Sequence, residues 1–103
     1  MGNATWVIDY EADVKKQIVA QMASGQMNTE DISVIRRWAT EVEEQGLAAT
    51  QANPTWRDHE LFDEWKGHRA ISFRIDGRLI YRIENGKLIV MVVRVTGSHD
   101  YKK

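Results

Sequence analysis

The sequence of 103 residues contains no cysteine and a single proline, Pro54. The lack of cysteine excludes disulfide frameworks, thiolate chemistry and cysteine-ligated zinc sites. The longest apolar run, Leu88–Val93, is far shorter than the ~20 residues that a transmembrane helix needs. The N-terminus has neither the basic segment nor the apolar stretch of a secretory signal. We therefore expect one cytoplasmic domain, residues 1–103, that does not contact a membrane.

Several motifs that define common enzyme classes are also missing. No glycine-rich phosphate loop precedes a predicted helix, which argues against nucleotide-dependent enzymes. The three histidines, His59, His68 and His99, do not have the spacing of metal ligands. No Gly-x-Ser-x-Gly motif for a nucleophilic serine occurs. The sequence thus predicts neither a metal site nor a cofactor.

Charge is distributed unevenly along the chain, although the net charge is only −1. Residues 1–63 contain five Lys and Arg against eleven Asp and Glu, a formal charge of −6. Residues 64–103 contain nine against four, a formal charge of +5. This asymmetry is typical of a C-terminal half that binds an anionic partner. It is equally typical of two halves that complement each other electrostatically, and charge alone favours neither interpretation.

The first half of the chain predicts a strand, two helices and a loop. Thr5–Ile8 is β-prone and predicts an edge strand. Apolar residues at helical spacing then predict two short helices, which should form an antiparallel hairpin. Residues 47–63 have no clear period, and a loop of this length is usually functional or contains a short helix. The predicted helix boundaries are Gly25 for the end of the first helix, Asn28 or Thr29 for the N-cap of the second, and Gly46 for its end.

Three antiparallel strands are predicted at His68–Ile75, Arg78–Glu84 and Lys87–Val95, with Asn85-Gly86 as a two-residue turn. For the first hairpin we predict a three-residue loop, Asp76–Arg78, because a two-residue turn would pair apolar with charged residues. The fold class is α+β, with the N-terminal strand and helical hairpin packed on one face of a small antiparallel sheet. The predicted pairs are Ile75 with Leu79, Phe73 with Tyr81, Ile71 with Ile83, Tyr81 with Val90 and Leu79 with Val92. The helices are expected to cover Phe73, Tyr81 and Val90, and the other face to present Ser72, Arg74, Ile80, Arg82, Ile89 and Met91.

This register brings Asp76, Arg78 and Arg94 to one end of the sheet, where the C-terminal tail with His99 begins. Taken singly, these residues have ordinary explanations: Asp76 suits a turn, and His99 a solvated tail. Together, one carboxylate, two arginines and one histidine from separate segments make a candidate site. The ordinary pKa of a histidine suits it to act as a general acid or base near neutral pH.

Four short motifs follow one another in the second half of the chain. They are Asp58-His59-Glu60-Leu61, Trp65-Lys66-Gly67-His68-Arg69, Asp76-Gly77-Arg78-Leu79-Ile80-Tyr81-Arg82-Ile83 and Arg94-Val95-Thr96-Gly97-Ser98-His99-Asp100. Their order and spacing over residues 58–100 resemble the RelE/ParE superfamily of bacterial toxins, and within it the YafQ branch. The helices resemble the family only in layout.

The resemblance implies a small α+β ribonuclease that enters the ribosomal A site and cleaves mRNA without a metal ion or another cofactor. In this chemistry the ribose 2′-hydroxyl attacks the adjacent phosphate, leaving a 2′,3′-cyclic phosphate and a 5′-hydroxyl. The resemblance also implies a cognate antitoxin protein as the partner that binds the toxin.

The family pattern assigns catalytic roles to four residues of this chain. His99 matches the C-terminal catalytic histidine, and Arg94 matches the arginine that steadies the charged phosphate. His59 and Asp76 match the other acid–base candidates. Ser72 stands where the YafQ pattern has a further histidine. The residues expected to bind RNA are Lys66, Arg69, Arg74, Arg78, Arg82 and Tyr101.

The predicted open face of the sheet is a candidate antitoxin surface, because apolar side chains on a basic face suit a partner chain. The same apolar residues would alternatively pack beneath residues 47–63. An antitoxin on this face is expected to be acidic where it meets the arginines. The apolar residues are Ile80, Ile89 and Met91, and the arginines are Arg74, Arg78 and Arg82.

Three other functions stay open on sequence grounds. A ParE-like toxin would bind gyrase on the same fold without nuclease chemistry, although binding alone does not need His99 or the pair His59 and Asp76. A nuclease domain of a secreted toxin, with an immunity protein as its partner, is a second. A degenerate, non-enzymatic member of the family is the third, and Ser72 in place of the family histidine keeps it open.

Overall fold

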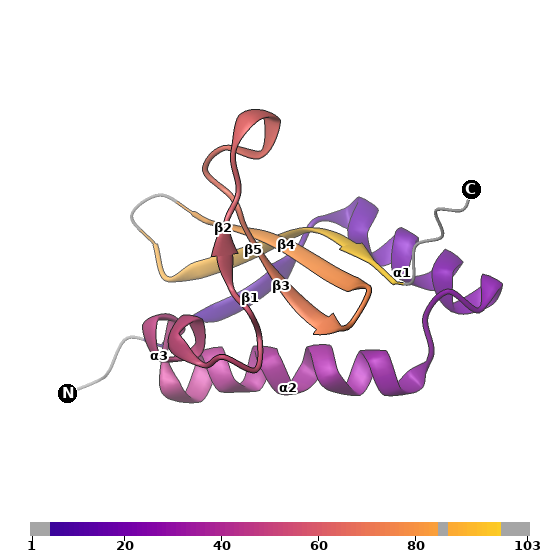
Figure 1. The fold of residues 1–103 in the computed structure, drawn as a ribbon, viewed down its shortest axis with the longest axis horizontal. Coiled ribbons are helices and arrows are strands. Elements are labelled where there is room, and N and C mark those ends of the chain that lie inside the picture. Colours follow the sequence, from indigo (N-terminus) through magenta and orange to yellow (C-terminus); the bar gives the residue numbers. More distant parts are fainter. Residues whose placement is uncertain (1–4, 85–86, 98–103) are drawn as a thin grey trace.

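The computed structural model describes residues 5–84 and 87–97. Its elements in chain order are β1 (Val7–Tyr10), α1 (Ala12–Ser24), α2 (Thr29–Gln45), α3 (Leu47–Ala52), β2 (His59–Glu60), the short 3-10 turn η1 (Asp63–Trp65), β3 (Arg69–Arg74), β4 (Gly77–Ile83) and β5 (Ile89–Thr96) (Figure 1). The predicted Asn85-Gly86 turn lies outside the described residues, as do His99 and Tyr101.

The strands form one five-stranded sheet in the order β1-β5-β4-β3-β2. Neighbouring strands are antiparallel except β1, which pairs with β5 in parallel. Helix α2 runs along one face of the sheet, and α1 packs chiefly on β5 (Figure 1). The predicted α+β class and the edge position of the N-terminal strand are confirmed. The sheet is therefore mixed, whereas a purely antiparallel sheet was predicted. The chain leaves β1 through the helices, and β5, which lies beside β1, runs in the same direction.

The predicted helix ends are confirmed by their caps. Gly25 follows α1 with φ 87°, a left-handed conformation that glycine adopts without steric cost. Asn28 caps α2 through a reciprocal pair: its side-chain oxygen accepts from the Asp31 N–H at 2.9 Å, and its own N–H donates to the Asp31 carboxylate at 3.1 Å. Gly46 ends α2.

The segment 47–63 contains the short helix α3, as expected of a loop of this length. Asn53 and Trp56 each donate a side-chain hydrogen bond to Glu41 of α2 at 3.0 Å, and Trp56 is buried. These contacts place α3 and Trp56 beside α2, on the helix side of the sheet. They do not place them over the half-buried side chains of Ile80, Ile89 and Met91.

The core lies between the helices and one face of the sheet. Trp38 and Val42 of α2 are fully buried, and the Trp38 ring lies 5.6 Å from the ring of Tyr81. Phe73, Tyr81 and Val90 are all buried, which confirms the predicted helix-facing side of the sheet. Burying aromatic and branched side chains together provides most of the stabilisation in a domain of this size.

The predicted three-residue loop between β3 and β4 is wrong, as are the pairs derived from it. Arg74 pairs with Gly77, so the turn contains only Ile75 and Asp76. The register shifts between Ser72 and Arg74, which is a β-bulge. The bulge keeps Phe73 in the core and leaves Ile75, expected to be buried, 93% exposed.

Gly77 shows why the turn closes early. A Cβ atom at this position would lie 2.5 Å from the Phe73 ring, so the ring occupies the space of the missing side chain. The buried ring and the glycine therefore fit together only in this register. Alternation alone could not reveal this fit, because it depends on the shape of one side chain.

The pairing predicted between β4 and β5 is also wrong. Leu79 lies opposite Val95 rather than Val92, and Tyr81 lies opposite Val92 rather than Val90. A second register shift, between Ile80 and Tyr81, leaves one extra residue on β5. This bulge lets Val92 and Val95 both face the core. Arg94, which lies between them, is exposed opposite Ile80.

Candidate functional site

A hollow of about 440 Å³ lies at the end of the sheet where the β3–β4 turn meets the end of β5. Its lining residues are Ile75, Asp76, Arg78, Ile80, Arg94 and Thr96. The predicted proximity of Asp76, Arg78 and Arg94 is therefore confirmed, in spite of the wrong register. The observed pairs differ from the predicted ones by two to four positions, but the β3–β4 turn and the end of β5 still lie at the same end of the sheet.

The two arginines in the hollow have no carboxylate partner among the described residues. Arg78 donates to the carbonyl oxygens of Ile75 and Gly77, at 3.0 and 3.1 Å. Arg94 donates from Nε to the Thr96 hydroxyl at 3.3 Å. Because only neutral oxygens orient these two guanidinium groups, their positive charge stays available to an anion. The planar guanidinium also matches the geometry of a phosphate, to which it can donate two hydrogen bonds.

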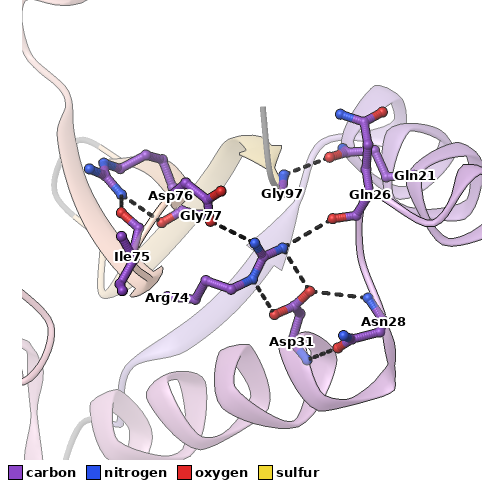
Figure 2. Close-up of polar contacts among 10 residues, drawn as sticks. Gln21, Gln26, Asn28, Asp31, Arg74, Ile75, Asp76, Gly77 and Gly97 are labelled. Carbon is purple, nitrogen blue, oxygen red and sulfur yellow. Dashed lines mark hydrogen bonds and ion pairs between the residues drawn. The ribbon is translucent and has the colours of Figure 1, made fainter. Parts of the chain in front are cut away.

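Asp76 lies in the same hollow but its carboxylate is paired. Arg74 donates from Nη1 to Asp76 Oδ1 at 2.6 Å (Figure 2). The Asp76 side chain remains partly exposed, so it can still reach a ligand in the hollow. The ion pair holds its carboxylate in one direction.

Arg74 itself lies elsewhere than predicted. We expected it on the face opposite the helices, but its guanidinium forms a two-bond ion pair with Asp31 of α2, at 2.8 and 2.9 Å (Figure 2). The physical reason is the bulge before Arg74, which reverses the direction of its side chain. Burial acts to raise the pKa of Asp31, but hydrogen bonds from Arg74 and the Asn28 backbone outweigh it, so the pKa is lowered.

Gln21 of α1 fixes the point where the C-terminal tail begins. Its side-chain oxygen accepts from the Gly97 N–H at 2.6 Å, and its Nε2 donates to the Val95 carbonyl at 2.8 Å. A Cβ atom at Gly97 would lie 2.4 Å from the Gln26 carbonyl oxygen, so no larger residue fits there without movement. Sequence reasoning missed Gln21 and Gln26, because a glutamine in a helix or a turn carries no local signal of such a contact.

His59 is not brought into the hollow. It lies on β2 opposite Ala70, which is opposite Ile80, which is in turn opposite Arg94. Directly paired residues share a face, so His59 and Arg94 lie in one row across the sheet. Three strand spacings separate them, or roughly 14 Å. His59 is exposed, and its Nδ1 lies 2.9 Å from the Arg57 carbonyl oxygen.

Three of the other cations expected to bind RNA have different surroundings. Arg69 is paired with Asp58, whose side chain is 1% exposed. Arg82 is paired with both Glu11 and Glu84, at 2.9 and 2.8 Å. Lys66 is exposed and forms no ion pair among the described residues. A second hollow, at the opposite end of the sheet where β4 ends and β5 begins, is lined by Lys66, Gly67, His68, Arg82, Ile83, Glu84 and Lys87.

Asp58 belongs to a buried polar network beneath β3. Besides Arg69, it accepts a hydrogen bond from the Tyr81 hydroxyl at 2.6 Å, and this hydroxyl accepts one from Gln51 Nε2 at 3.0 Å. Burial and the bond to Asp58 both raise the pKa of Tyr81 well above its usual value of 10.0. The Asp-His motif therefore contributes Asp58 to the interior and His59 to the surface.

The raised pKa of Tyr81 predicts a stability that depends on alkaline pH. The folded state holds the phenolic proton more tightly than the unfolded state, so this stabilisation is complete below pH 10 and is lost as the pH rises toward the folded-state pKa. We expect the free energy of unfolding to fall above pH 10 by up to about 1.4 kcal/mol per pH unit from this group. Urea unfolding between pH 8 and 11 measures it.

Tyr81→Phe is the comparison for this measurement. The variant should be less stable at pH 8, because Asp58 loses a donor, but its stability should fall less steeply above pH 10. Tyr10, whose pKa burial also raises, contributes equally to both proteins. Identical slopes for the two proteins would contradict the assignment.

Residues 5–84 and 87–97 contain no group of three potential metal ligands among His, Asp and Glu. In the same residues, no helix has the length and apolarity required to cross a bilayer.

Residues 5–84 and 87–97 combine a small mixed sheet, a hollow with two arginines that have no carboxylate partner there, and a Gly97 held by Gln21. Residues 7–101 match the model of a family described as "Bacterial toxin of type II toxin-antitoxin system, YafQ". The chain belongs to the YafQ family. This confirms the resemblance on which the motif assignments rest, because the match spans the helices as well as the C-terminal motifs.

Solved toxin structures share the fold of this YafQ-family chain. Escherichia coli YafQ is 20% identical, with a TM-score of 0.69 over 89% of this chain and 92% of that one. YafQ in the E. coli DinJ-YafQ toxin-antitoxin complex is 19% identical, with a TM-score of 0.63 over 90% and 92%. The toxin-antitoxin complex RelBE2 from Mycobacterium tuberculosis gives 14% identity and a TM-score of 0.63 over 91% and 99%. Comparison with curated protein sequences finds no match.

Proposed function

We propose that this YafQ-family toxin is an endoribonuclease that cleaves mRNA in the ribosomal A site by attack of the ribose 2′-hydroxyl, without a metal ion. The observation that carries the proposal is the hollow at the end of the sheet, where Arg78 and Arg94 lie with no carboxylate partner among the described residues. Such a hollow suits the scissile phosphate. It adjoins the point where the tail that carries His99 begins.

The chemistry requires one proton acceptor, one proton donor and a fixed positive charge. The base takes the proton of the 2′-hydroxyl, the O2′–P bond forms, the P–O5′ bond breaks, and the acid protonates the leaving 5′-oxygen. In our proposal Arg94, with Arg78, stabilises the negative charge that builds up on the pentacoordinate phosphate. His99 and Asp76 exchange the protons.

The covalent chain supports the choice of His99. It follows Gly97 by two residues, and two residues span at most about 7 Å. Gly97 is fixed by Gln21 next to the hollow. His59, three strands away from Arg94, would contact a neighbouring nucleotide rather than the scissile phosphate. Lys66 and Arg82, in the second hollow of the sheet, would contact the RNA backbone, and Tyr101 would stack on a base.

A cognate antitoxin is the proposed protein partner and the cytoplasm the proposed compartment. The solved relatives DinJ-YafQ and RelBE2 are toxin-antitoxin complexes. On this chain Ile80, Ile89 and Met91 line the sheet face beside Arg78 and Arg82. An antitoxin that covers this face would be acidic opposite the arginines. Reversing the charge of Arg78 should weaken the complex, and an unchanged affinity would count against this surface.

Inducible expression in a bacterial host tests the proposed function. The protein should arrest growth and produce new 5′ ends in an abundant mRNA, mapped by primer extension, at positions spaced by codons. Growth arrest without any mRNA cleavage would overturn the proposed ribonuclease activity. DNA breaks that depend on gyrase would then identify the ParE-like alternative. Co-expression of a cognate antitoxin should restore growth.

A further inference from the structure

One guanidinium, that of Arg74, connects two parts of the chain that are far apart in the sequence, the β3–β4 turn and residues 26–31. Its Nε and Nη2 donate to the Asp31 carboxylate on α2, at 2.8 and 2.9 Å. Its Nη1 donates to Asp76 in the β3–β4 turn at 2.6 Å, and its Nη2 also donates to the Gln26 carbonyl at 3.0 Å. Figure 2 shows these contacts converging from the turn on one side and from the start of α2 on the other.

The α2 side of this cluster is held by several contacts. Asp31 is only 4% exposed, and its carboxylate also accepts from the Asn28 N–H in the capping box. Its position is therefore fixed by the start of a 17-residue helix as well as by Arg74. A two-bond arginine–carboxylate pair fixes direction as well as distance.

The tail side of the cluster shares the same connection between α1 and α2. Gln26, whose carbonyl accepts from Arg74, is the residue whose carbonyl oxygen a Cβ at Gly97 would contact at 2.4 Å. The turn that carries Asp76 and the base of the C-terminal tail are thus both held against residues 26–31. Asp76 also needs this contact to keep its carboxylate directed, since Arg74 is its one ion-pair partner among the described residues.

We infer that the Asp31–Arg74 pair positions the reactive end of the sheet: it holds Asp76 and the base of the tail in register with each other, and Arg74 does not itself bind RNA. The inference rests on the proposed ribonuclease function. Binding a phosphate would require Arg74 to leave a buried carboxylate, and removing one partner of a buried pair leaves an uncompensated charge. Arg78 and Arg94 meet no such cost.

Asp31→Asn separates positioning from RNA binding, because Asp31 is buried and cannot touch RNA. We expect Asp31→Asn and Arg74→Gln each to lower the maximal cleavage rate at saturating toxin by about 10-fold to 100-fold in a reconstituted translation reaction. The toxin concentration that gives half the maximal rate should stay unchanged. Arg74→Lys should recover part of the rate, since an ammonium restores the charge but not the two-bond geometry.

Asn28→Ala is the matched control, because it removes the side-chain cap of α2 and leaves both partners of the pair in place. It should lower the melting temperature, as Asp31→Asn also does, while the cleavage rate stays at the wild-type level. If Asn28→Ala lost as much of the cleavage rate as Asp31→Asn, general destabilisation would explain the loss, and the positioning role of the Asp31–Arg74 pair would be overturned. A wild-type rate in Asp31→Asn, together with a raised half-maximal concentration in Arg74→Gln, would show that Arg74 binds RNA directly.

Amide hydrogen exchange gives a readout that is independent of the ribonuclease. Exchange at residues 76–78 and at Gly97 should accelerate in Asp31→Asn and in Arg74→Gln, and stay unchanged in Asn28→Ala. If the wild-type protein cleaves no RNA, the proposed function fails while exchange still tests the coupling of turn and tail. Unchanged exchange in both variants would overturn the inference even if cleavage were lost.

Discussion

His99→Ala should abolish growth arrest and mRNA cleavage while the protein stays folded. A positioned general acid or base typically contributes a factor of about 10² to 10⁴ to the rate. In the proposed mechanism His99 exchanges protons with the reacting oxygens, because a displacement that takes one proton and gives another in the same step needs a second group besides Asp76. The measurement is the initial cleavage rate of the purified variant on programmed ribosomes, beside that of the wild type.

His59→Ala and His68→Ala are the matched controls for His99. They remove the other two histidines of the chain, and neither lines the hollow at the end of the sheet. His68→Ala and His59→Ala should both lose far less of the rate than His99→Ala. If His99→Ala cleaves at the wild-type rate, the tail histidine has no chemical role and the assignment of the acid–base pair is wrong.

Arg94→Ala should lower the cleavage rate by about 10² to 10³, the range seen when one preorganised group for developing charge is removed. Arg94 is exposed, has no carboxylate partner among the described residues, and is oriented by Thr96. Its removal therefore takes positive charge from the hollow without leaving a buried group unpaired. The melting temperature should change by no more than a few degrees, because exposed arginines of this kind contribute little stability.

Arg36→Ala controls for the loss of one positive charge. Arg36 is exposed on α2 and lines a groove between α1 and α2, on the helix side of the sheet. It should cleave as the wild type does. Arg94→Lys should keep part of the activity, since an ammonium supplies charge without the guanidinium fork. Equal losses in Arg94→Ala and Arg36→Ala would mean that only net charge matters and would contradict a site at the end of the sheet.

The helices were predictable from sequence because their boundaries are local. Gly25, Asn28 and Gly46 each mark a helix end through the conformation or hydrogen bonding of the residue itself. The strand registers were not predictable in the same way. Each of the two hairpins contains a β-bulge, and both bulges exist because core side chains such as Phe73 and Val95 must reach the same face.

The residues of the candidate site were likewise predictable only in part. Asp76, Arg78 and Arg94 were predictable because strand ends meet at the same edge of a sheet in any plausible register. The Asp31–Arg74 pair was not, because it joins residues 43 positions apart and depends on the bulge that turns Arg74 toward α2. Gln21 likewise shows its contact with Gly97 only once the fold is known.

The most direct test of the proposed function is the chemistry of the RNA ends. Purified toxin is incubated with programmed ribosomes that have been cross-linked so that they stay assembled when EDTA removes the free magnesium. The cleaved mRNA is then analysed by mass spectrometry. The account predicts a 2′,3′-cyclic phosphate on one fragment and a 5′-hydroxyl on the other, with and without free metal. Fragments with a 5′-phosphate, or intact mRNA from a folded protein that still arrests growth, would contradict it.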